Sequence, residues 1–273
     1  MENVVSVNSI SHRFGDFTAV NQLSFEVHSQ EIFGLLGPNG AGKTTTILLM
    51  IGLLGLDEGE IQVLGLDPQQ QARQVHQCIG YVPQETNVYL DLSAVDNLWH
   101  HAALYCEDLS IVEDKIEEIL KLMSLWERRN DALRTYSGGM KRRLALARTL
   151  LHEPEVIFFD EPTLGVDVQG KHVIWEHIQK QREDGKSFII STNDMMEADR
   201  LCDRLVIIDS GVAIALDSPE NLKAGLGQDI VTLQTSVAIE EPKKIFQGID
   251  IRAVMHPQPG VVRFEVRDAD TQV

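Results

Sequence analysis

The chain has 273 residues, which is enough for one large domain with an appendage or for two domains. Its 43% hydrophobic and 24% charged content is ordinary for a folded protein, whereas a net charge of −17 disfavours non-specific binding to nucleic acid or to an anionic membrane. The longest apolar run, residues 47–56, is interrupted by glycine and too short to span a bilayer. Three scattered cysteines, at positions 78, 106 and 202, are expected to be reduced thiols of a cytoplasmic protein.

The N-terminal part of the chain has the alternating or clustered β-formers that are typical of short strands. A turn is expected at Gly15 and Asp16, and a helix over residues 44–54, directly after a glycine-rich segment. The expected strands cover residues 4–10, 23–27, 31–37, 60–68 and 77–84.

Residues 86–136 differ in character and are expected to form an inserted helical subdomain. In residues 112–126 the apolar positions Ile116, Ile119, Leu120 and Met123 follow helical spacing, with acidic residues on the opposite face. The methionine and aromatic side chains of this block are therefore interpreted as core.

From residue 141 to residue 211, helices and strands alternate, which indicates a parallel sheet covered on both sides. The expected helices cover residues 141–151, 173–183 and a stretch ending at 202, and the expected strands cover 156–159, 188–191 and 204–211. We thus expect an α/β domain over residues 1–219.

A shift in composition after Pro219 predicts a small α+β domain over residues 220–273. It comprises a strand at 229–236, a short helix at 240–249 and a hairpin at 251–266 with a Pro-Gly turn. The hairpin has one apolar face and too few elements to cover it. That face would pack on the core or on a second subunit, or else the chain is a truncated version of a longer one.

The segment GPNGAGKTT matches G-x-x-x-x-G-K-[ST] in full and lies between an apolar strand and a helix. Glycines let successive backbone N–H groups wrap around phosphates, the lysine reaches the β- and γ-phosphates, and the first threonine hydroxyl ligates Mg²⁺. The predicted ATP-binding residues are Gly37, Pro38, Asn39, Gly40, Ala41, Gly42, Lys43, Thr44 and Thr45.

The segment VIFFDEP places two carboxylates after a buried apolar strand. Asp160 is predicted to bind the metal ion directly or through water, and Glu161 to orient and deprotonate the attacking water. Two carboxylates at a strand end could also form a simple turn, but the phosphate loop upstream favours the catalytic interpretation.

Between these motifs, Ser137, Gly138 and Gly139 open a strongly helical run whose free N–H groups form an anion site. The cations that follow, Lys141, Arg142, Arg143 and Arg148, are interpreted as a solvated helix face, because the acidic chain disfavours a nucleic-acid site.

The order and spacing of the three motifs resemble the ATP-binding subunits of ABC transporters, over roughly residues 4–216. The resemblance implies a P-loop core with an N-terminal antiparallel β subdomain and an inserted helical subdomain. It also implies that the Ser-Gly-Gly segment closes on nucleotide held by a second subunit, so that two subunits enclose two ATP molecules. The signature departs from the usual Leu-Ser-Gly-Gly-Gln by having Tyr136 and Met140 at its ends.

Further roles follow from this resemblance, residue by residue. Gln84 resembles the glutamine that contacts Mg²⁺ and reports nucleotide state to the membrane subunit, and Asp167 the aspartate that crosses the dimer interface. Phe14 stands where an aromatic ring stacks on adenine, although a core phenylalanine is the alternative. Asn193 stands where the family has a histidine that contacts the γ-phosphate.

Asparagine is shorter than histidine, uncharged and unable to shuttle a proton, so the change predicts normal ATP binding with slow turnover. The alternative is that Asn193 only caps the helix that begins near Asp194.

The resemblance thus predicts an ATPase that drives a separate integral-membrane permease, on the inner face of the membrane, as a homodimer or heterodimer. The segment EPTLGVDV and the tail resemble the ATPases of multidrug or daunorubicin-resistance (ABC-2) exporters. The alternatives are a soluble ABC ATPase acting on ribosomes or chromosomes, and a nucleotide sensor with little turnover. Ribosomal members usually carry two cassettes and chromosomal members long coiled coils, and the sequence has neither.

Overall fold

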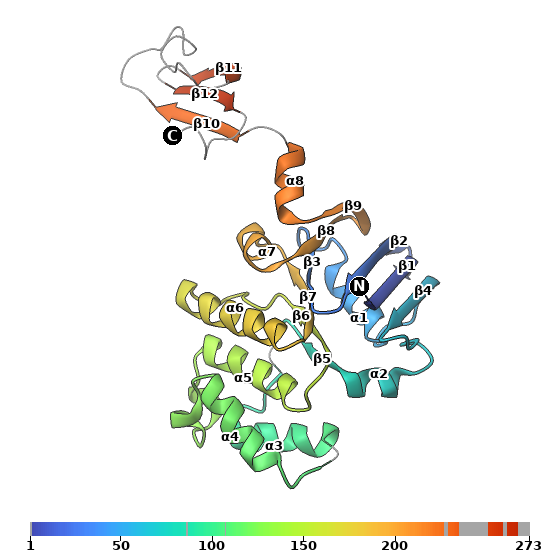
Figure 1. Ribbon diagram of the computed structural model, residues 1–273, viewed down its shortest axis with the longest axis vertical. Coiled ribbons are helices and arrows are strands. Elements are labelled where there is room, and N and C mark those ends of the chain that lie inside the picture. Colours follow the sequence, from blue (N-terminus) through green and yellow to red (C-terminus); the bar gives the residue numbers. More distant parts are fainter. Residues whose placement is uncertain are drawn as a thin grey trace. The chain divides into compact units, whose positions relative to one another are not determined.

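The computed structural model divides the chain into two compact units, Met1–Pro219 and Glu220–Val273 (Figure 1). It describes residues 2–85, 87–106, 108–226, 229–234, 251–258 and 261–266, with side chains described up to residue 224. No helix within these ranges is long and apolar enough to cross a membrane.

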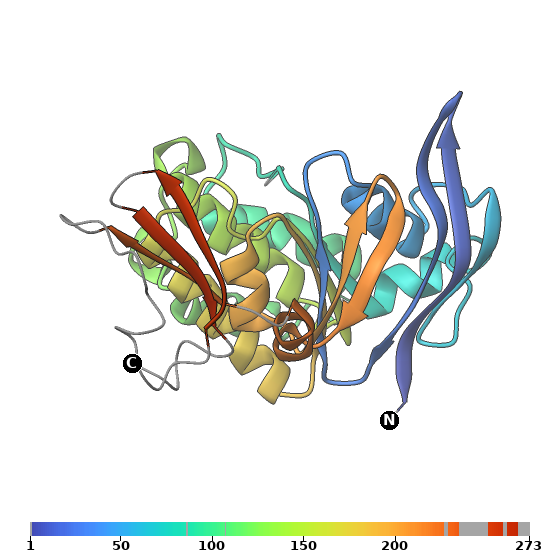
Figure 2. The ribbon, with the colours of Figure 1, turned by 90° about the horizontal axis from the view of Figure 1, so that it is seen from above.

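The first unit begins with an antiparallel sheet of three strands in the order β2-β1-β4. A tight turn at the predicted Gly15 joins β1 to β2, where Phe14 pairs with Phe17. In Figure 2 this long blue hairpin lies at the right edge of the first unit, away from the green and yellow helices. The strands are β1 (Asn3–Phe14), β2 (Phe17–His28) and β4 (Glu58–Val63).

A six-stranded sheet in the order β5-β6-β7-β3-β8-β9 forms the centre of the first unit. Its first five strands are parallel, and β9 pairs with β8 in the antiparallel sense. The inner strands β3, β6 and β7 are buried along their whole length, as their continuous apolar runs predict. The strands are β3 (Ile32–Leu36), β5 (Ile79–Val82), β6 (Val156–Asp160), β7 (Ser187–Thr192), β8 (Arg204–Asp209) and β9 (Val212–Asp217).

Helix α1 (Lys43–Met50) packs against strands of both sheets, and its buried side chains Ile47, Leu49 and Met50 join the two into one core. Helices α5 (Gly138–Leu150), α6 (Val168–Glu183) and α7 (Met195–Leu201) pack against β5, β7 and β3. The glycine-rich segment before α1 and the strands β3, β6 and β7 are therefore held by one continuous core.

The helical subdomain contains α3 (Ala94–Tyr105) and α4 (Val112–Leu122), which pack on each other and on α5 (Figure 1). Helix α3 begins with a capping box in which Ser93 and Asp96 bond each other's backbone. Ile116, Leu120 and Met123 are buried, as their spacing predicts. Two 3₁₀ turns, Trp126–Arg128 and Leu133–Thr135, lead to α5.

Several element boundaries differ from the sequence predictions. Helix α1 ends at Met50, four residues early, because Gly52 adopts a left-handed conformation (φ 71°). Helix α6 begins at Val168, five residues early, because Asp167 caps it. A short helix not predicted from the sequence, α2 (Ala72–Cys78), takes the start of the strand expected at 77–84, so Cys78 is helical.

The second unit starts within α8 (Pro219–Leu226), another helix the sequence did not predict. It contains an antiparallel sheet in the order β10-β12-β11, formed by β10 (Asp229–Gln234), β11 (Ile251–Gln258) and β12 (Val261–Val266). The predicted strand and hairpin are thus present. The helix predicted at 240–249 and the Pro-Gly turn lie outside the described residues.

Candidate nucleotide site

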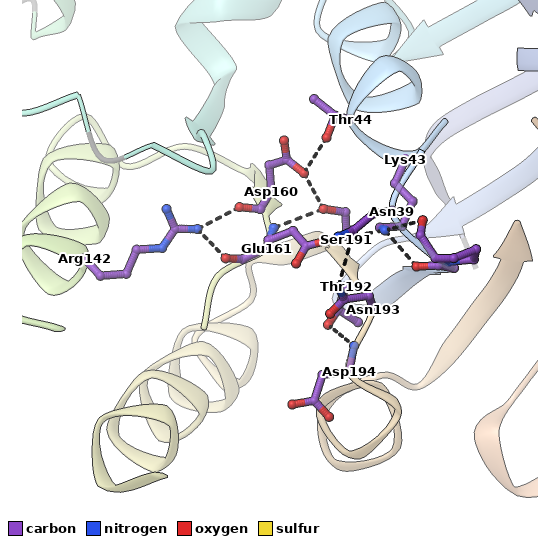
Figure 3. Close-up of polar contacts among 12 residues, drawn as sticks. Asn39, Lys43, Thr44, Arg142, Asp160, Glu161, Ser191, Thr192, Asn193 and Asp194 are labelled. Carbon is purple, nitrogen blue, oxygen red and sulfur yellow. Dashed lines mark hydrogen bonds and ion pairs between the residues drawn. The ribbon is translucent and has the colours of Figure 1, made fainter. Parts of the chain in front are cut away.

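Three neighbouring parallel strands end at the candidate site. The strand order β6-β7-β3 places the end of β6 at Asp160, the end of β7 at Thr192 and the end of β3 at Leu36 on one edge of the sheet. Figure 3 shows polar side chains from these strand ends and from the segments that follow them, together with Arg142 of α5. The carboxyl edge of a parallel sheet is where α/β proteins bind ligands.

The phosphate loop connects β3 to α1 and curls around the Lys43 side chain. The Lys43 ammonium group donates to the carbonyl oxygens of Gly37 at 2.8 Å and of Pro38 at 3.1 Å. Gly42 adopts φ 102°, and a Cβ there would lie 2.4 Å from the Ala19 carbonyl oxygen, so only glycine fits. The loop therefore has the curled backbone that binds phosphates through its N–H groups.

Two groups, one at the start of α1 and one at the end of β6, offer oxygen ligands to a metal ion. The Thr44 hydroxyl donates to Asp160 Oδ1 at 3.1 Å, and Ser191 Oγ donates to the same oxygen at 2.5 Å (Figure 3). A hydroxyl and a carboxylate at this separation fit Mg²⁺, which takes one or two protein oxygens together with phosphates and water. Ser191 was not singled out from the sequence, where it was only the polar end of a buried strand.

Glu161 follows β6 in a left-handed backbone conformation (φ 51°), which is unusual for a residue other than glycine. Its N–H group donates to both the carbonyl oxygen and Oγ of Ser191, at 3.1 and 3.0 Å. Its carboxylate lies 3.3 Å from the Lys43 ammonium group. The strained backbone is thus fixed by β7, and the carboxylate points toward the phosphate loop.

Asn193, at the end of β7, is bonded to the phosphate loop: its Nδ2 donates to Asn39 Oδ1 at 3.0 Å (Figure 3). The interpretation of Asn193 as a helix cap is wrong. The cap of α7 is Asp194, whose Oδ1 accepts from the N–H groups of Met196 and Glu197. Asp194 also forms an ion pair with Lys171 at 2.7 Å, and these contacts lower the pKa of its carboxyl group.

The remaining predicted site residues lie on other elements of the first unit. Phe14 is 51% exposed, which excludes the core alternative for its ring, and the His12 ring packs edge-on against it at 4.6 Å. Gln84 is exposed in the loop after β5, the strand next to β6. Ser137 caps α5 by accepting from Met140, and Asp167 caps α6 by accepting from Gly170 at 2.7 Å.

The prediction of a solvated basic face on α5 is wrong. Arg142 is 5% exposed and donates to backbone carbonyl oxygens, as Arg143 does to Met123 and Arg148 to Asn87. The pKa of the Arg142 guanidinium is lowered to about 10, chiefly by burial, so that it remains charged at neutral pH. Helical spacing could have predicted this burial, because Arg142 lies on the same face of α5 as the apolar residues Ala145 and Leu146.

The sequence matches the ABC transporter family over residues 20–164, which is more than half of the chain. The chain belongs to the ABC transporter family. Two curated relatives of this ABC ATPase are a Nod factor export ATP-binding protein I of Cupriavidus pinatubonensis and the linearmycin resistance ATP-binding protein LnrL of Bacillus subtilis. The first is 37% identical over 84% of this chain and 70% of its own length, and the second 38% identical over 87% and 76%.

Solved structures of ABC ATPases have the same fold. A structure described as the ATP-binding subunit of an ABC transporter covers 82% of this chain and 93% of its own, with a TM-score of 0.75 at 27% identity. A dimeric ATP-binding cassette in a post-hydrolysis state, bound to ADP and phosphate, covers 79% and 98%, with a TM-score of 0.70 at 25% identity. The expected P-loop ABC ATPase fold is confirmed, and this chain is a nucleotide-binding, ATP-hydrolysing transporter subunit.

Proposed function

We propose that this ABC ATPase binds Mg-ATP at the phosphate-loop site and closes as a dimer around two nucleotides, driving export through a separate membrane permease. The observation that carries the proposal is the cluster at the sheet edge, where Lys43 meets Glu161 at 3.3 Å and Thr44 meets Asp160 at 3.1 Å. Cation, base, carboxylate and hydroxyl are the groups that phosphoryl transfer to water requires.

Each of these groups has a role in the proposed reaction. The phosphate-loop N–H groups and Lys43 bind the β- and γ-phosphates, and Thr44 and Asp160, with Gln84, hold Mg²⁺. The metal ion supplies charge neutralisation at the phosphate oxygens. Glu161 accepts a proton from the water that attacks the γ-phosphorus, and the bond to the ADP oxygen breaks. Asn193 offers its amide as a hydrogen-bond donor near the γ-phosphate.

Exposed groups at helix starts support the dimer. Ser137 and Gly138 are exposed at the start of α5, and Asp167 is exposed at the start of α6. Neither Ser137 nor Asp167 bonds to the phosphate loop within the described residues, so both are free to face a second subunit. The first N–H groups of α5 then bind the nucleotide held by that subunit.

The export direction is supported by the names of the relatives, which concern Nod factor export and linearmycin resistance. In this proposal the subunit lies on the inner face of the membrane, where the permease holds it. The net charge of −17 supports a protein partner over an anionic lipid surface.

The proposal is tested with Glu161→Gln, which removes the base while keeping the size of the side chain. We expect this variant to bind ATP, to lose turnover and to accumulate a dimer at saturating Mg-ATP, measured by light scattering. The matched control is Glu153→Gln, an exposed carboxylate paired with Lys115 in the region of the helical subdomain, which should hydrolyse ATP like the unmodified chain. A Glu161→Gln protein that stays monomeric would contradict the homodimer and leave the heterodimer.

A second candidate function is a nucleotide sensor with little turnover, and Asn193 is the observation that favours it. The amide donates a hydrogen bond but cannot accept and return a proton as imidazole does. Turnover of the purified protein with and without its permease distinguishes the two candidates. A rate that stays at the background level in both preparations would favour the sensor.

A further inference from the structure

Arg142 makes an unusually complete set of hydrogen bonds. A guanidinium group has five N–H donors, and the structure gives five backbone carbonyl acceptors for them. Nε donates to Pro162 at 2.9 Å, Nη1 to Pro83 at 2.5 Å and Gln84 at 3.1 Å, and Nη2 to Asp160 at 2.8 Å and Glu161 at 2.9 Å.

These acceptors belong to two separate segments of the site. Three of them are consecutive residues at the end of β6, including the predicted metal ligand Asp160 and the predicted base Glu161. The other two belong to the loop after β5 that carries Gln84. Figure 3 shows the guanidinium group beside the carbonyl groups of Asp160 and Glu161, on the side away from Ser191. The Glu161 turn is therefore held from both sides, by Ser191 at its N–H group and by Arg142 at its carbonyl group.

A buried arginine is costly for folding alone. Burying a cation without a partner is strongly destabilising, and apolar residues of similar volume often stabilise a fold as well or better. Here the hydrogen-bond acceptors are carbonyl groups, and the nearby carboxylates of Asp160, Glu197 and Glu161 also stabilise the charge. A planar group with five donors in fixed directions suits a position that must keep two loops in register.

The position of Arg142 on α5 gives this contact its consequence. Ser137, the N-cap of the same helix, is exposed and is proposed to face the nucleotide of the second subunit. Arg142 lies little more than one helical turn further on and is bonded to the catalytic turn of its own subunit. One short, rigid helix thus connects one nucleotide site to the catalytic groups of the other.

We propose that Arg142 is a positioning residue that couples the two ATP sites: contact of α5 with the partner's nucleotide sets the backbone of Glu161 and Gln84 in the same subunit. This inference rests on the proposed dimer. A displacement of α5 by a few tenths of an ångström would be transmitted to the segments that carry Glu161 and Gln84. The reason is that the Arg142 guanidinium group bonds both segments and moves them together. The base of each site is then in position only when the other site is occupied and closed.

The test uses Arg142→Lys and Arg142→Gln in the full chain, with Arg143→Gln as the matched control. Lysine keeps the charge but has three donors for five carbonyls, and glutamine keeps two donors without charge. Arg143 is on the same helix and donates to one carbonyl oxygen, that of Met123 at 2.7 Å. For each protein, the ATP dissociation constant, kcat, KM, the Hill coefficient for ATP and the melting temperature are measured.

We expect ATP affinity within about twofold of the unmodified chain, because the phosphate loop is untouched. Misplacement of the base should lower kcat roughly 10- to 100-fold in Arg142→Gln, and less in Arg142→Lys. The Hill coefficient should fall to about one in the Gln variant. The Arg143→Gln control should keep both kcat and cooperativity. If the Gln variant does not fold, the Lys variant decides by the same readouts.

A purely structural role predicts a lower melting temperature with unchanged kcat per folded protein, and that result would overturn the inference. Cooperativity that persists in Arg142→Gln would overturn the coupling alone and leave the proposed dimer intact. If the unmodified protein shows a Hill coefficient of one, and Glu161→Gln forms no ATP-dependent dimer, both the coupling and the proposed homodimer fail.

Discussion

The Lys43 ammonium nitrogen lies 3.3 Å from the Glu161 carboxylate, and the two side chains are only 5% and 9% exposed. Each buried charge compensates the other, and Lys43 is further satisfied by two carbonyl groups of the phosphate loop. In the proposed reaction the γ-phosphate replaces Glu161 as the ion-pair partner of Lys43. The Glu161 carboxylate is then available to accept a proton from water. ATP binding therefore breaks the ion pair that catalysis also needs broken. Mutation of one residue at a time separates the contribution of Lys43 to ATP binding from that of Glu161 to turnover.

Lys43→Ala should weaken ATP binding roughly 10- to 100-fold, because it removes a charge-assisted contact to the phosphates. The same change leaves the Glu161 carboxylate buried without its cation and should lower the melting temperature. The double variant Lys43→Ala/Glu161→Gln should regain stability but not affinity. Calorimetry and thermal melts measure both, and an unchanged ATP affinity in Lys43→Ala would show that the site is wrongly assigned.

Phe14→Ala should weaken ATP binding on the order of tenfold by removing the ring that stacks on adenine. Phe14→Tyr keeps a ring of the same shape and should keep the affinity. Because Phe14 is 51% exposed, neither change should alter the melting temperature much. Equal affinities for the Ala and Tyr variants would argue that the base binds elsewhere.

Asn193→His should raise kcat by about 10- to 100-fold with little change in KM, because imidazole acts on the water and the developing charge rather than on ground-state binding. Stability should change little, since the Asn193 side chain makes an exposed hydrogen bond to Asn39 and does not cap α7. The stability control is Asp194→Ala, which removes the actual cap and should cost about 1 kcal/mol. An Asn193→His protein with unchanged kcat would mean that the position does not contact the reacting groups.

The stability of the first unit should fall in acid because of a histidine pair between the helical subdomain and the core. His101 Nε2 lies 3.5 Å from His152 Nδ1, and His152 Nε2 donates to the Ile79 carbonyl oxygen at 2.9 Å. Burial first, and then the charges of His152 and Arg148, lower the pKa of His101 to about 3. Burial lowers the pKa of His152 as well.

The direction of this change in stability with pH follows from proton linkage. Between about pH 6.5 and pH 3 the unfolded chain protonates His101 and the folded chain does not, so the free energy of unfolding falls as the pH falls, by about 1.4 kcal/mol per pH unit for one group. Urea unfolding at pH 7 and pH 5 measures this slope. In His101→Gln the slope should be smaller, and an unchanged slope would exclude this residue as a cause.

Removal of the residues after Leu226 should leave ATP affinity within about twofold, since the site residues all lie in the unit Met1–Pro219. The cut must not reach β9, because the Gly211 N–H group at the β8–β9 turn donates to the Ala41 carbonyl oxygen of the phosphate loop at 3.0 Å. We expect assembly with the permease to be lost. If ATP binding disappears while the melt shows a folded core, the domain boundary is wrong.

The sequence alone determined the parts of this protein whose geometry is local. The phosphate loop is nine consecutive residues, and a strand, a glycine-rich turn and a helix start suffice to predict its curled backbone. The same holds for the Gly15 turn and the buried face of α4. Which residue caps α7 is also a local matter. Asn193 and Asp194 are both residue types that cap helices, so the sequence left the choice open until the hydrogen bonds of Asp194 were known.

Only the tertiary structure decided how distant segments meet. The order β5-β6-β7-β3 is not the chain order, yet it sets the loops carrying Gln84, Glu161, Asn193 and the phosphate loop next to one another. Strand order arises from pairing between residues far apart in the chain, such as Ile32 with Phe188, which no local pattern encodes. Arg142 shows the same limit: its charge suggested solvent, and only burial against five carbonyl groups from two loops makes it part of the site.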